Sequence, residues 1–181
     1  MPKYVALFRA LNVGGNNLIK MDVLRSLCET AGLKNVKTFL VAGNVTFESA
    51  SKNATLLASK IEKQLFALTQ RELKVIVLPL EHLTTIAKQD PFKTIDPTDA
   101  MLCVIFFAET PANTPKLPLT STTEYFEVLD IGDRVAFVVA RRKPNGWFGF
   151  PNGFMEKQLG VVATTRQWST IKKFVAFAEK G

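Results

Sequence analysis

The chain has 181 residues, of which 47% are hydrophobic and 22% charged, and its formal net charge is +7. This size and composition suit a globular protein with a sizeable core, built as one domain or as two small halves. The longest unbroken apolar run, residues 101–108, is far shorter than the roughly 20 residues that a membrane-spanning helix needs. No basic, apolar leader opens the sequence, so we expect a protein that is neither secreted nor membrane-inserted.

The positive charge is concentrated in the last quarter of the chain. Residues 1–133 contain 14 basic and 14 acidic side chains, whereas residues 134–181 contain nine basic and two acidic ones. The second segment therefore carries the whole net charge, and such a bias attracts phosphate or nucleic acid. A solvated basic surface that aids solubility is the alternative.

The first half alternates strand and helix signals. In chain order we expect a strand at residues 4–10, a helix at 21–31 stopped by Gly32, strands at 36–41 and 45–48 joined by a Gly43-Asn44 turn, a helix capped by Asn53, and a strand at 73–78. This β-α-β-β-α-β order is that of the ferredoxin-like unit.

The second half repeats the pattern loosely. In chain order we expect a short helix at residues 80–88, a loop around 90–97, a buried strand at 101–108, a loop at 109–123, a hairpin of strands 124–129 and 134–140, a loop at 143–153, a helical turn at 154–159 and a closing helix at 168–179. The prediction is an α+β fold of two ferredoxin-like (βαββαβ) repeats, the second degenerate, with a C-terminal helix. The halves are residues 1–89 and 100–181, and we expect them to form one compact unit.

A polar, glycine-rich loop follows the first predicted strand, at residues 12–20. Gly14 and Gly15 leave backbone N–H groups accessible, and Lys20 at the start of the next helix adds an ammonium that could converge on the same anion. The loop matches neither the P-loop nor the G-x-G-x-x-G pattern, and a tight connection without a ligand is the alternative.

The run Thr164-Thr165-Arg166 precedes the closing helix. With Thr165 as the N-cap, Arg166 would lie at the positive end of the helix, where a cation is disfavoured by roughly 0.3–1 kcal/mol. A bound anion would remove this penalty. The alternative is an ion pair between Arg166 and a carboxylate such as Glu156.

Four aromatic side chains follow the basic run at residues 141–143, namely Trp147, Phe148, Phe150 and Phe154. Nucleic acid bases can stack on such rings while basic side chains hold the phosphates, although the RNP1 pattern is absent. Packing of these rings against the sheet is the alternative that we favour.

Catalytic and metal-binding patterns are missing. His82 is the only histidine, expected on a solvent-facing helix position, and Cys28 and Cys103 fall at core positions. A transition-metal site, a Cys-His dyad and a Ser-His-Asp triad are therefore not indicated, while a pair of carboxylates stays open. The cysteine usage fits the reducing cytoplasm.

Three stretches of the sequence resemble one bacterial family. They are Tyr4-Val5-Ala6-Leu7-Phe8-Arg9-Ala10-Leu11-Asn12-Val13-Gly14-Gly15-Asn16-Asn17, the turn Ala42-Gly43-Asn44-Val45, and the ending Lys157…Leu159-Gly160-Val161…Thr164-Thr165-Arg166-Gln167-Trp168. On these motifs the chain resembles, nearly end to end, an uncharacterised family known as domain of unknown function 1697. The resemblance implies two ferredoxin-like repeats and brings no activity with it.

Two positions depart from the family's motifs. The family usually has Arg-Gly-Ile-Asn where this chain has Arg9-Ala10-Leu11-Asn12, and Arg-Asn-Trp where this chain has Gln167 between Arg166 and Trp168. Glutamine keeps the amide one methylene further out, so hydrogen bonding survives with altered geometry.

Two hypotheses of function follow. The first is a cytoplasmic protein, enzyme or not, that binds a phosphate-bearing or nucleotide-like ligand in a cleft between the 12–20 loop and the Thr165-Arg166 helix start. Its predicted binding residues supply backbone N–H groups, amides and charge, and they are Asn12, Gly14, Gly15, Asn16, Lys20, Gly43, Asn44, Lys157, Thr165, Arg166 and Trp168. The second is a single-stranded nucleic-acid-binding module that uses segment 134–181. A protein-interaction domain without a small ligand is a third possibility.

Overall fold

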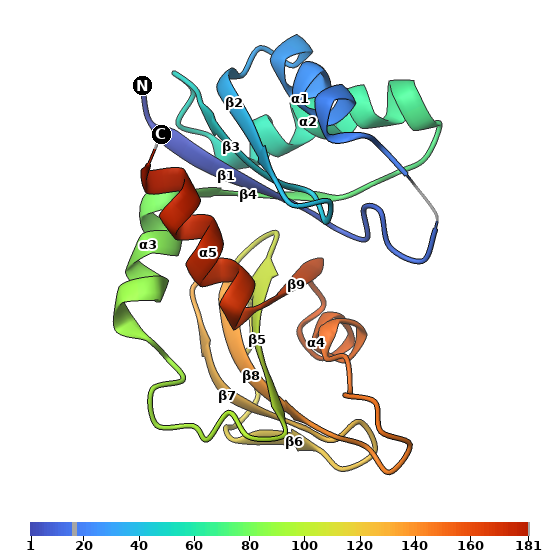
Figure 1. The fold of residues 1–181 in the computed structure, drawn as a ribbon, viewed down its shortest axis with the longest axis vertical. Coiled ribbons are helices and arrows are strands. Elements are labelled where there is room, and N and C mark those ends of the chain that lie inside the picture. The colour runs from blue at the N-terminus through green and yellow to red at the C-terminus, as the bar shows by residue number, and fades with distance from the viewer. Residues whose placement is uncertain (16–17, 181) are drawn as a thin grey trace. The chain divides into compact units, whose positions relative to one another are not determined.

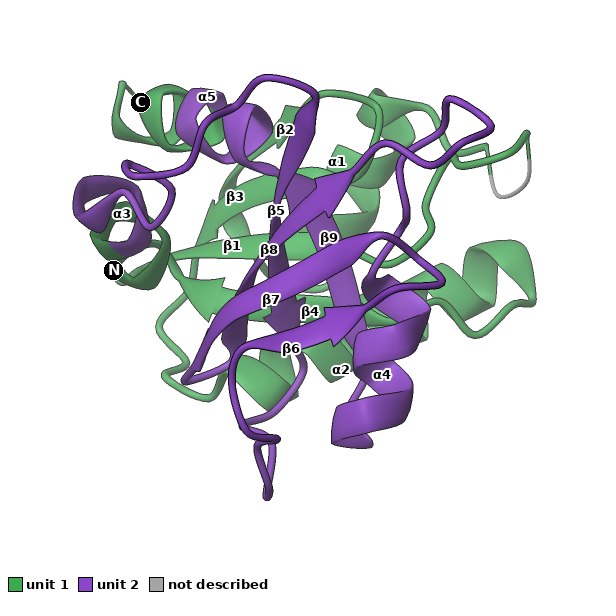
Figure 2. Ribbon diagram, turned by 90° about the horizontal axis from the view of Figure 1, so that it is seen from below, with its two compact units in different colours: residues 1–85, 174–181 green, residues 86–173 purple. Residues whose placement is uncertain are grey.

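The computed structural model describes residues 1–15 and 18–180. Over these residues the protein is an α+β fold with two antiparallel sheets and five helices (Figure 1). The chain divides into two compact units (Figure 2), which are described separately below. Unit 1 comprises Met1–Thr85 and Phe174–Gly181, and unit 2 comprises Ile86–Lys173.

Unit 1 is a four-stranded sheet with two helices on one face (Figure 1). Its elements are β1 (Lys3–Phe8), α1 (Met21–Thr30), β2 (Lys34–Phe39), β3 (Asn44–Glu48), α2 (Ala54–Thr69) and β4 (Val75–Pro79). The strand order is β2-β3-β1-β4, and β1 pairs antiparallel with both neighbours. The predicted order of helices and strands in this half is confirmed, and the predicted ends that differ do so by at most two residues.

Local chemistry explains where these elements begin and end. The Asn53 side chain accepts a hydrogen bond from the Leu56 backbone N–H at 2.9 Å, which is the predicted cap of α2. The strand β1 ends at Phe8 rather than at residue 10 because Ala10 and Asn12 have positive φ angles, outside the extended region. The core beneath the helices contains the fully buried Leu24 and Cys28.

Unit 2 is a five-stranded sheet in the order β6-β7-β8-β5-β9. Its strands and its own helix are β5 (Ala100–Phe107), β6 (Leu119–Ser121), β7 (Phe126–Gly132), β8 (Val135–Arg141), α4 (Asn152–Leu159) and β9 (Ala163–Gln167). The apolar strand β5 lies between β8 and β9, as expected of a strand buried inside a sheet. Met155 and Leu159 of α4 pack against Cys103, Ile105 and other core side chains of the sheet.

Two helices pass from one unit to the other. They are α3 (Leu80–Gln89) and α5 (Trp168–Glu179), and the bounds of α5 are those predicted from its apolar spacing. None of the helices within residues 1–15 and 18–180 is long and apolar enough to cross a membrane.

The sequence prediction is wrong about the strand β9. Residues 163–167 form this strand, antiparallel to β5, where we expected the cap of the closing helix. The physical reason is that β-branched Thr164 and Thr165 suit an extended backbone, and the β5 edge offers them backbone hydrogen bonds. The short strand β6 was also missed, inside a stretch expected to be a loop.

Candidate functional site

In unit 1 the candidate Asn12 is held by the polypeptide itself. Its Nδ2 donates to the carbonyl oxygens of Ile19 at 2.9 Å and Val41 at 2.8 Å, and its Oδ1 accepts from the Ile19 N–H at 2.7 Å. One amide hydrogen therefore ties the loop to its own end at Ile19, and the other ties it to the turn between β2 and β3 at Val41. An asparagine suits this position because the φ angle is +56°, and asparagine tolerates the left-handed region.

Gly43 and Asn44 in that turn also have structural partners. The Gly43 carbonyl accepts from the Phe8 N–H at 3.0 Å, and a Cβ at Gly43 would lie 2.8 Å from atoms of both Phe8 and Leu11. Asn44 is fully buried and donates from Nδ2 to the Phe39 carbonyl at 3.1 Å. The first and second family motifs thus contact each other in this unit.

Gly14, Gly15 and Lys20 are exposed. Both glycines have positive φ angles, and a Cβ on either would meet nothing within 4 Å. Lys20 precedes α1 and its side chain caps nothing. Asn16, the other candidate of this loop, lies outside the described residues.

In unit 2 the candidates Thr165 and Arg166 lie on β9. Arg166 is buried, and its Nη1 donates to Thr164 Oγ1 and to the Thr165 carbonyl, both at 2.9 Å. Burial lowers the pKa of Arg166 to about 10. The expected place for this guanidinium, in the first turn of the closing helix, is therefore wrong, because α5 begins only at Trp168.

Two residues outside the predicted binding set, Asn152 and Glu156, hold this strand in place. Asn152 is buried, donates to the Ala163 carbonyl at 3.1 Å and accepts from Thr165 Oγ1 at 2.9 Å. Glu156 Oε1 accepts from the Ala163 N–H at 2.9 Å. For Asn152 the sequence signal was the Asn152-Gly153 pair. We interpreted this pair as part of a loop, but it forms the first two residues of α4. Lys157 lies exposed in the last turn of the same helix.

A hollow of about 420 Å³ lies where β9 continues into α5. The residues that matter for its chemistry are Met101, Phe148, Gln167, Trp168, Ser169 and Lys172. All of them belong to unit 2.

The hollow combines aromatic, apolar and cationic groups. Trp168 is only 4% exposed and packs on Phe92, with ring centroids 5.6 Å apart. The Lys172 ammonium lies 5.7 Å from the centre of the Trp168 ring, which is within cation–π distance. Gln167, the departure from the family's asparagine, donates to Met101 Sδ at 3.7 Å and lines the same hollow.

The four aromatic side chains after the basic run divide into two pairs. Phe154 packs edge-on against Phe126, with centroids 5.0 Å apart, and Phe148 is half-buried. Trp147 and Phe150 are exposed. The expected packing against the sheet is confirmed for Phe148 and Phe154, whereas Trp147 and Phe150 face solvent.

Groups suited to metal binding or nucleophilic chemistry are scarce. Within the described part of the chain, no three His, Cys, Asp or Glu side chains gather in a group that could hold a metal ion. Cys28 and Cys103 are both free and buried, and burial raises the pKa of each thiol to about 12. His82 lies on α3 and is half-buried.

Comparisons with known proteins add a family and a fold. Residues 1–137 match the family described as "Protein of unknown function (DUF1697)", so the ending motif at residues 157–168 lies beyond the matched range. The chain is similar to the conserved bacterial protein SP0830 from Streptococcus pneumoniae, at 19% identity, a TM-score of 0.66 and 99% coverage of both chains. At this identity the likeness concerns the fold. No curated protein matches the chain.

Proposed function

Since the chain belongs to the DUF1697 family of proteins of unknown function, we propose its function from its own side chains. We propose that unit 2 binds a phosphate-bearing, nucleotide-like ligand in the hollow beside Trp168. The observation that carries this proposal is that one hollow of about 420 Å³ holds an aromatic ring, an ammonium and two neutral polar side chains. Ligand sites typically combine an apolar wall with a few polar groups in this way.

Each side chain has a chemical part in the proposal. The Lys172 ammonium compensates the charge of a phosphate, while Ser169 and Gln167 offer a hydroxyl and an amide for hydrogen bonds. Met101 and Phe148 provide apolar surface for a base or another flat ring.

Of the residues that the sequence predicted to bind the phosphate-bearing ligand, Trp168 lines this hollow. Thr165 and Arg166 lie just before it on β9. The other candidates for ligand binding are Asn12, Gly14, Gly15, Asn16, Lys20, Gly43, Asn44 and Lys157, and their participation stays a prediction.

The finer fold prediction is also part of the proposal. The β-α-β-β-α-β order and the antiparallel sheet of unit 1 support a ferredoxin-like repeat. Unit 2 would be its degenerate counterpart, in which the short strand β6 occupies the stretch where the first helix of a repeat is expected, and β7, β8, β5 and β9 follow the sheet order of β2, β3, β1 and β4. The two free, buried thiols support the cytoplasm as the compartment.

The test compares two neighbouring lysines of α5. Lys172 lines the hollow, whereas Lys173 is exposed next to it and does not. Thermal melting is followed while inorganic phosphate, and then adenosine monophosphate, is added to the wild type, to Lys172→Gln and to Lys173→Gln. At about 100 times Kd a ligand adds about 2.7 kcal/mol to the free energy of unfolding, which is readily seen as a rise in Tm.

We expect the wild type and Lys173→Gln to show the same ligand-induced rise in Tm, and Lys172→Gln to lose most of it. Equal rises in all three proteins would place the phosphate elsewhere. The absence of any rise in the wild type with either probe would refute the proposed ligand class.

A further inference from the structure

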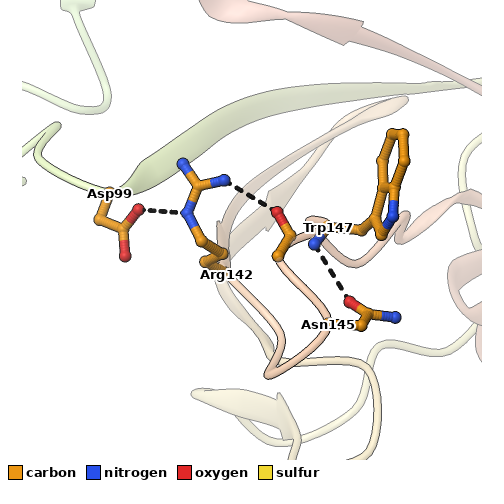
Figure 3. Close-up of polar contacts among 5 residues, drawn as sticks. Asp99, Arg142, Asn145 and Trp147 are labelled. Atoms are coloured by element: carbon orange, nitrogen blue, oxygen red, sulfur yellow. Dashed lines mark hydrogen bonds and ion pairs between the residues drawn. The ribbon is translucent and has the colours of Figure 1, made fainter.

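Residues 141–150 run from the end of β8 toward α4 and form a hairpin that several contacts hold in place. Of these residues, Phe148 is the one that lines the hollow. Arg142 lies at the base of the hairpin, where its Nε is 2.5 Å from Asp99 Oδ1 and its Nη1 donates to the Gly146 carbonyl at 2.8 Å. Figure 3 shows both contacts. Across the hairpin the Lys143 N–H donates to the Trp147 carbonyl at 2.7 Å, and the Trp147 N–H donates to Asn145 Oδ1 at 3.1 Å. The turn that carries Trp147 is therefore held by Arg142 at its base and by hydrogen bonds between its own residues.

The hairpin is also pressed against the segment that precedes β7. A Cβ at Gly149 would lie 1.7 Å from the Glu124 carbonyl oxygen, so the two backbones approach more closely than any other residue permits. The Arg141 N–H donates to the Tyr125 carbonyl at 2.7 Å, and Lys143 Nζ lies 2.6 Å from Glu124 Oε2. These contacts bring residues 124–125 and 141–150 side by side.

This pair of segments presents three exposed aromatic rings. Trp147 is 75% exposed, Phe150 63% and Tyr125 40%. An aromatic side chain in a protein core normally buries about 150–250 Å² of its surface, whereas much of the surface of these three rings is exposed to solvent. Rings held on a rigid backbone lose little entropy when a partner stacks on them.

Three consecutive basic residues accompany these rings in the sequence. Arg141, Arg142 and Lys143 come from the same hairpin, and residues 134–181 carry the whole net charge of the protein. Asp99 and Glu124 pair with Arg142 and Lys143, which holds the two cations in place and compensates much of their charge, and the Arg142 side chain is still 47% exposed. Arg141 is exposed as well.

We propose that this surface, made of Tyr125 and residues 141–150, binds single-stranded nucleic acid. Bases stack on Trp147, Phe150 and Tyr125, while Arg141 and its neighbours hold the phosphates. We expect a single strand and not a duplex, because in a duplex the neighbouring base pairs cover the faces of each base and leave no face for an aromatic ring to stack on. The inference goes beyond the ligand of the hollow and does not rest on it.

The experiment measures the binding of a fluorescein-labelled oligouridine of about twelve nucleotides to the whole chain by anisotropy. Variants are Trp147→Ala, Trp147→Phe and Phe150→Ala. The matched control is Phe66→Ala, which removes an aromatic ring that is 48% exposed on α2 in unit 1. A duplex of the same length is the second probe. Arg141→Gln reports the phosphate contacts.

We expect Trp147→Ala to weaken binding of the single strand about tenfold or more, Phe150→Ala to weaken it less, and Trp147→Phe and Phe66→Ala to bind nearly as the wild type. Arg141→Gln should make the affinity for the single strand less dependent on salt, by roughly the slope that one phosphate contact contributes. Because Trp147 faces solvent, its removal should leave the melting temperature unchanged. If Trp147→Ala fails to fold, quenching of the exposed Trp147 fluorescence in the wild type by the unlabelled strand gives the answer.

Three results would overturn the inference: no binding of the single strand, equal binding of the duplex, or equal losses in Trp147→Ala and Phe66→Ala. Each of them leaves the response of the hollow to adenosine monophosphate intact, so the two proposals fail separately.

Discussion

The Nδ2 atom of Asn12 lies 2.8 Å from the carbonyl oxygen of Val41, and this hydrogen bond joins the loop after β1 to the turn between β2 and β3. The same side chain also bonds both the N–H and the carbonyl of Ile19. A residue that the sequence suggested as a ligand contact thus fastens two loops of unit 1 together.

Asn12→Ala should lower the free energy of unfolding by about 3 kcal/mol, because three hydrogen bonds of about 1 kcal/mol each are lost. The control is Asn35→Ala, since Asn35 also has a positive φ angle but makes one exposed bond, to Glu48. We expect a loss of about 1 kcal/mol for this control. Urea unfolding measures both, and equal losses would contradict the assignment.

Gly43→Ala should be far more damaging than Gly14→Ala. Both glycines have positive φ angles, so each variant carries a backbone penalty of roughly 1–2 kcal/mol. At Gly43 the new methyl would also collide with Phe8 and Leu11, whereas at Gly14 it meets nothing. We expect an additional loss of about 1–3 kcal/mol at Gly43 alone. Similar melting temperatures for the two variants would show that the turn is looser than described.

Gly149→Ala should detach the hairpin from the Glu124 segment. The added methyl has no space beside the Glu124 carbonyl, whereas Gly146→Ala adds a methyl to an open position at a φ angle of +85°. We expect Gly146→Ala to keep most of the affinity for single strands, and Gly149→Ala to lose as much as Trp147→Ala. Anisotropy measures both, and retained binding by a folded Gly149→Ala would mean that bracing is unnecessary.

The stability should fall as the pH rises through about 9. Burial raises the pKa of Cys28 and Cys103 from 9.0 to about 12, so the unfolded chain releases these protons first. The stabilisation from each neutral thiol is complete below pH 9 and is lost toward pH 12, by about 1.4 kcal/mol per pH unit. Above about pH 10 the lowered pKa of Arg166 acts in the opposite direction.

Urea unfolding between pH values of about 8 and about 10 tests this dependence. The double variant Cys28→Ala, Cys103→Ala should flatten the slope over this range, although it lowers the overall stability. A slope that is the same in the wild type and the double variant would assign the effect to other groups.

The sequence predicted the helices and strands of unit 1 because their signals are local. The apolar spacing, the cap at Asn53 and the stop at Gly32 act within a few residues. The strand β9 was missed because Thr164, Thr165 and Arg166 are polar, and only pairing with β5 reveals it. The partner strand lies some sixty residues away in sequence, and Thr164 and Thr165 by themselves suit a helix cap as well as an extended strand.

The candidate site was harder to predict for the same reason. Trp168 was selected from the sequence, whereas Lys172 and Ser169 were not, since they are ordinary residues of an amphipathic helix. Asn12 and Gly43 were selected for their polarity and flexibility. These properties also suit the partners they have in unit 1, Val41 and Phe8.

The most direct test uses the two tryptophans, Trp147 and Trp168, whose indole N–H groups give two separate signals in a proton–nitrogen correlation spectrum. Adenosine monophosphate is titrated into the nitrogen-labelled wild type. We predict that the Trp168 indole signal moves saturably, together with the backbone amides of Ser169 and Lys172. Saturable shifts confined to Gly14, Gly15 and their neighbours, with Trp168 unmoved, would contradict the account.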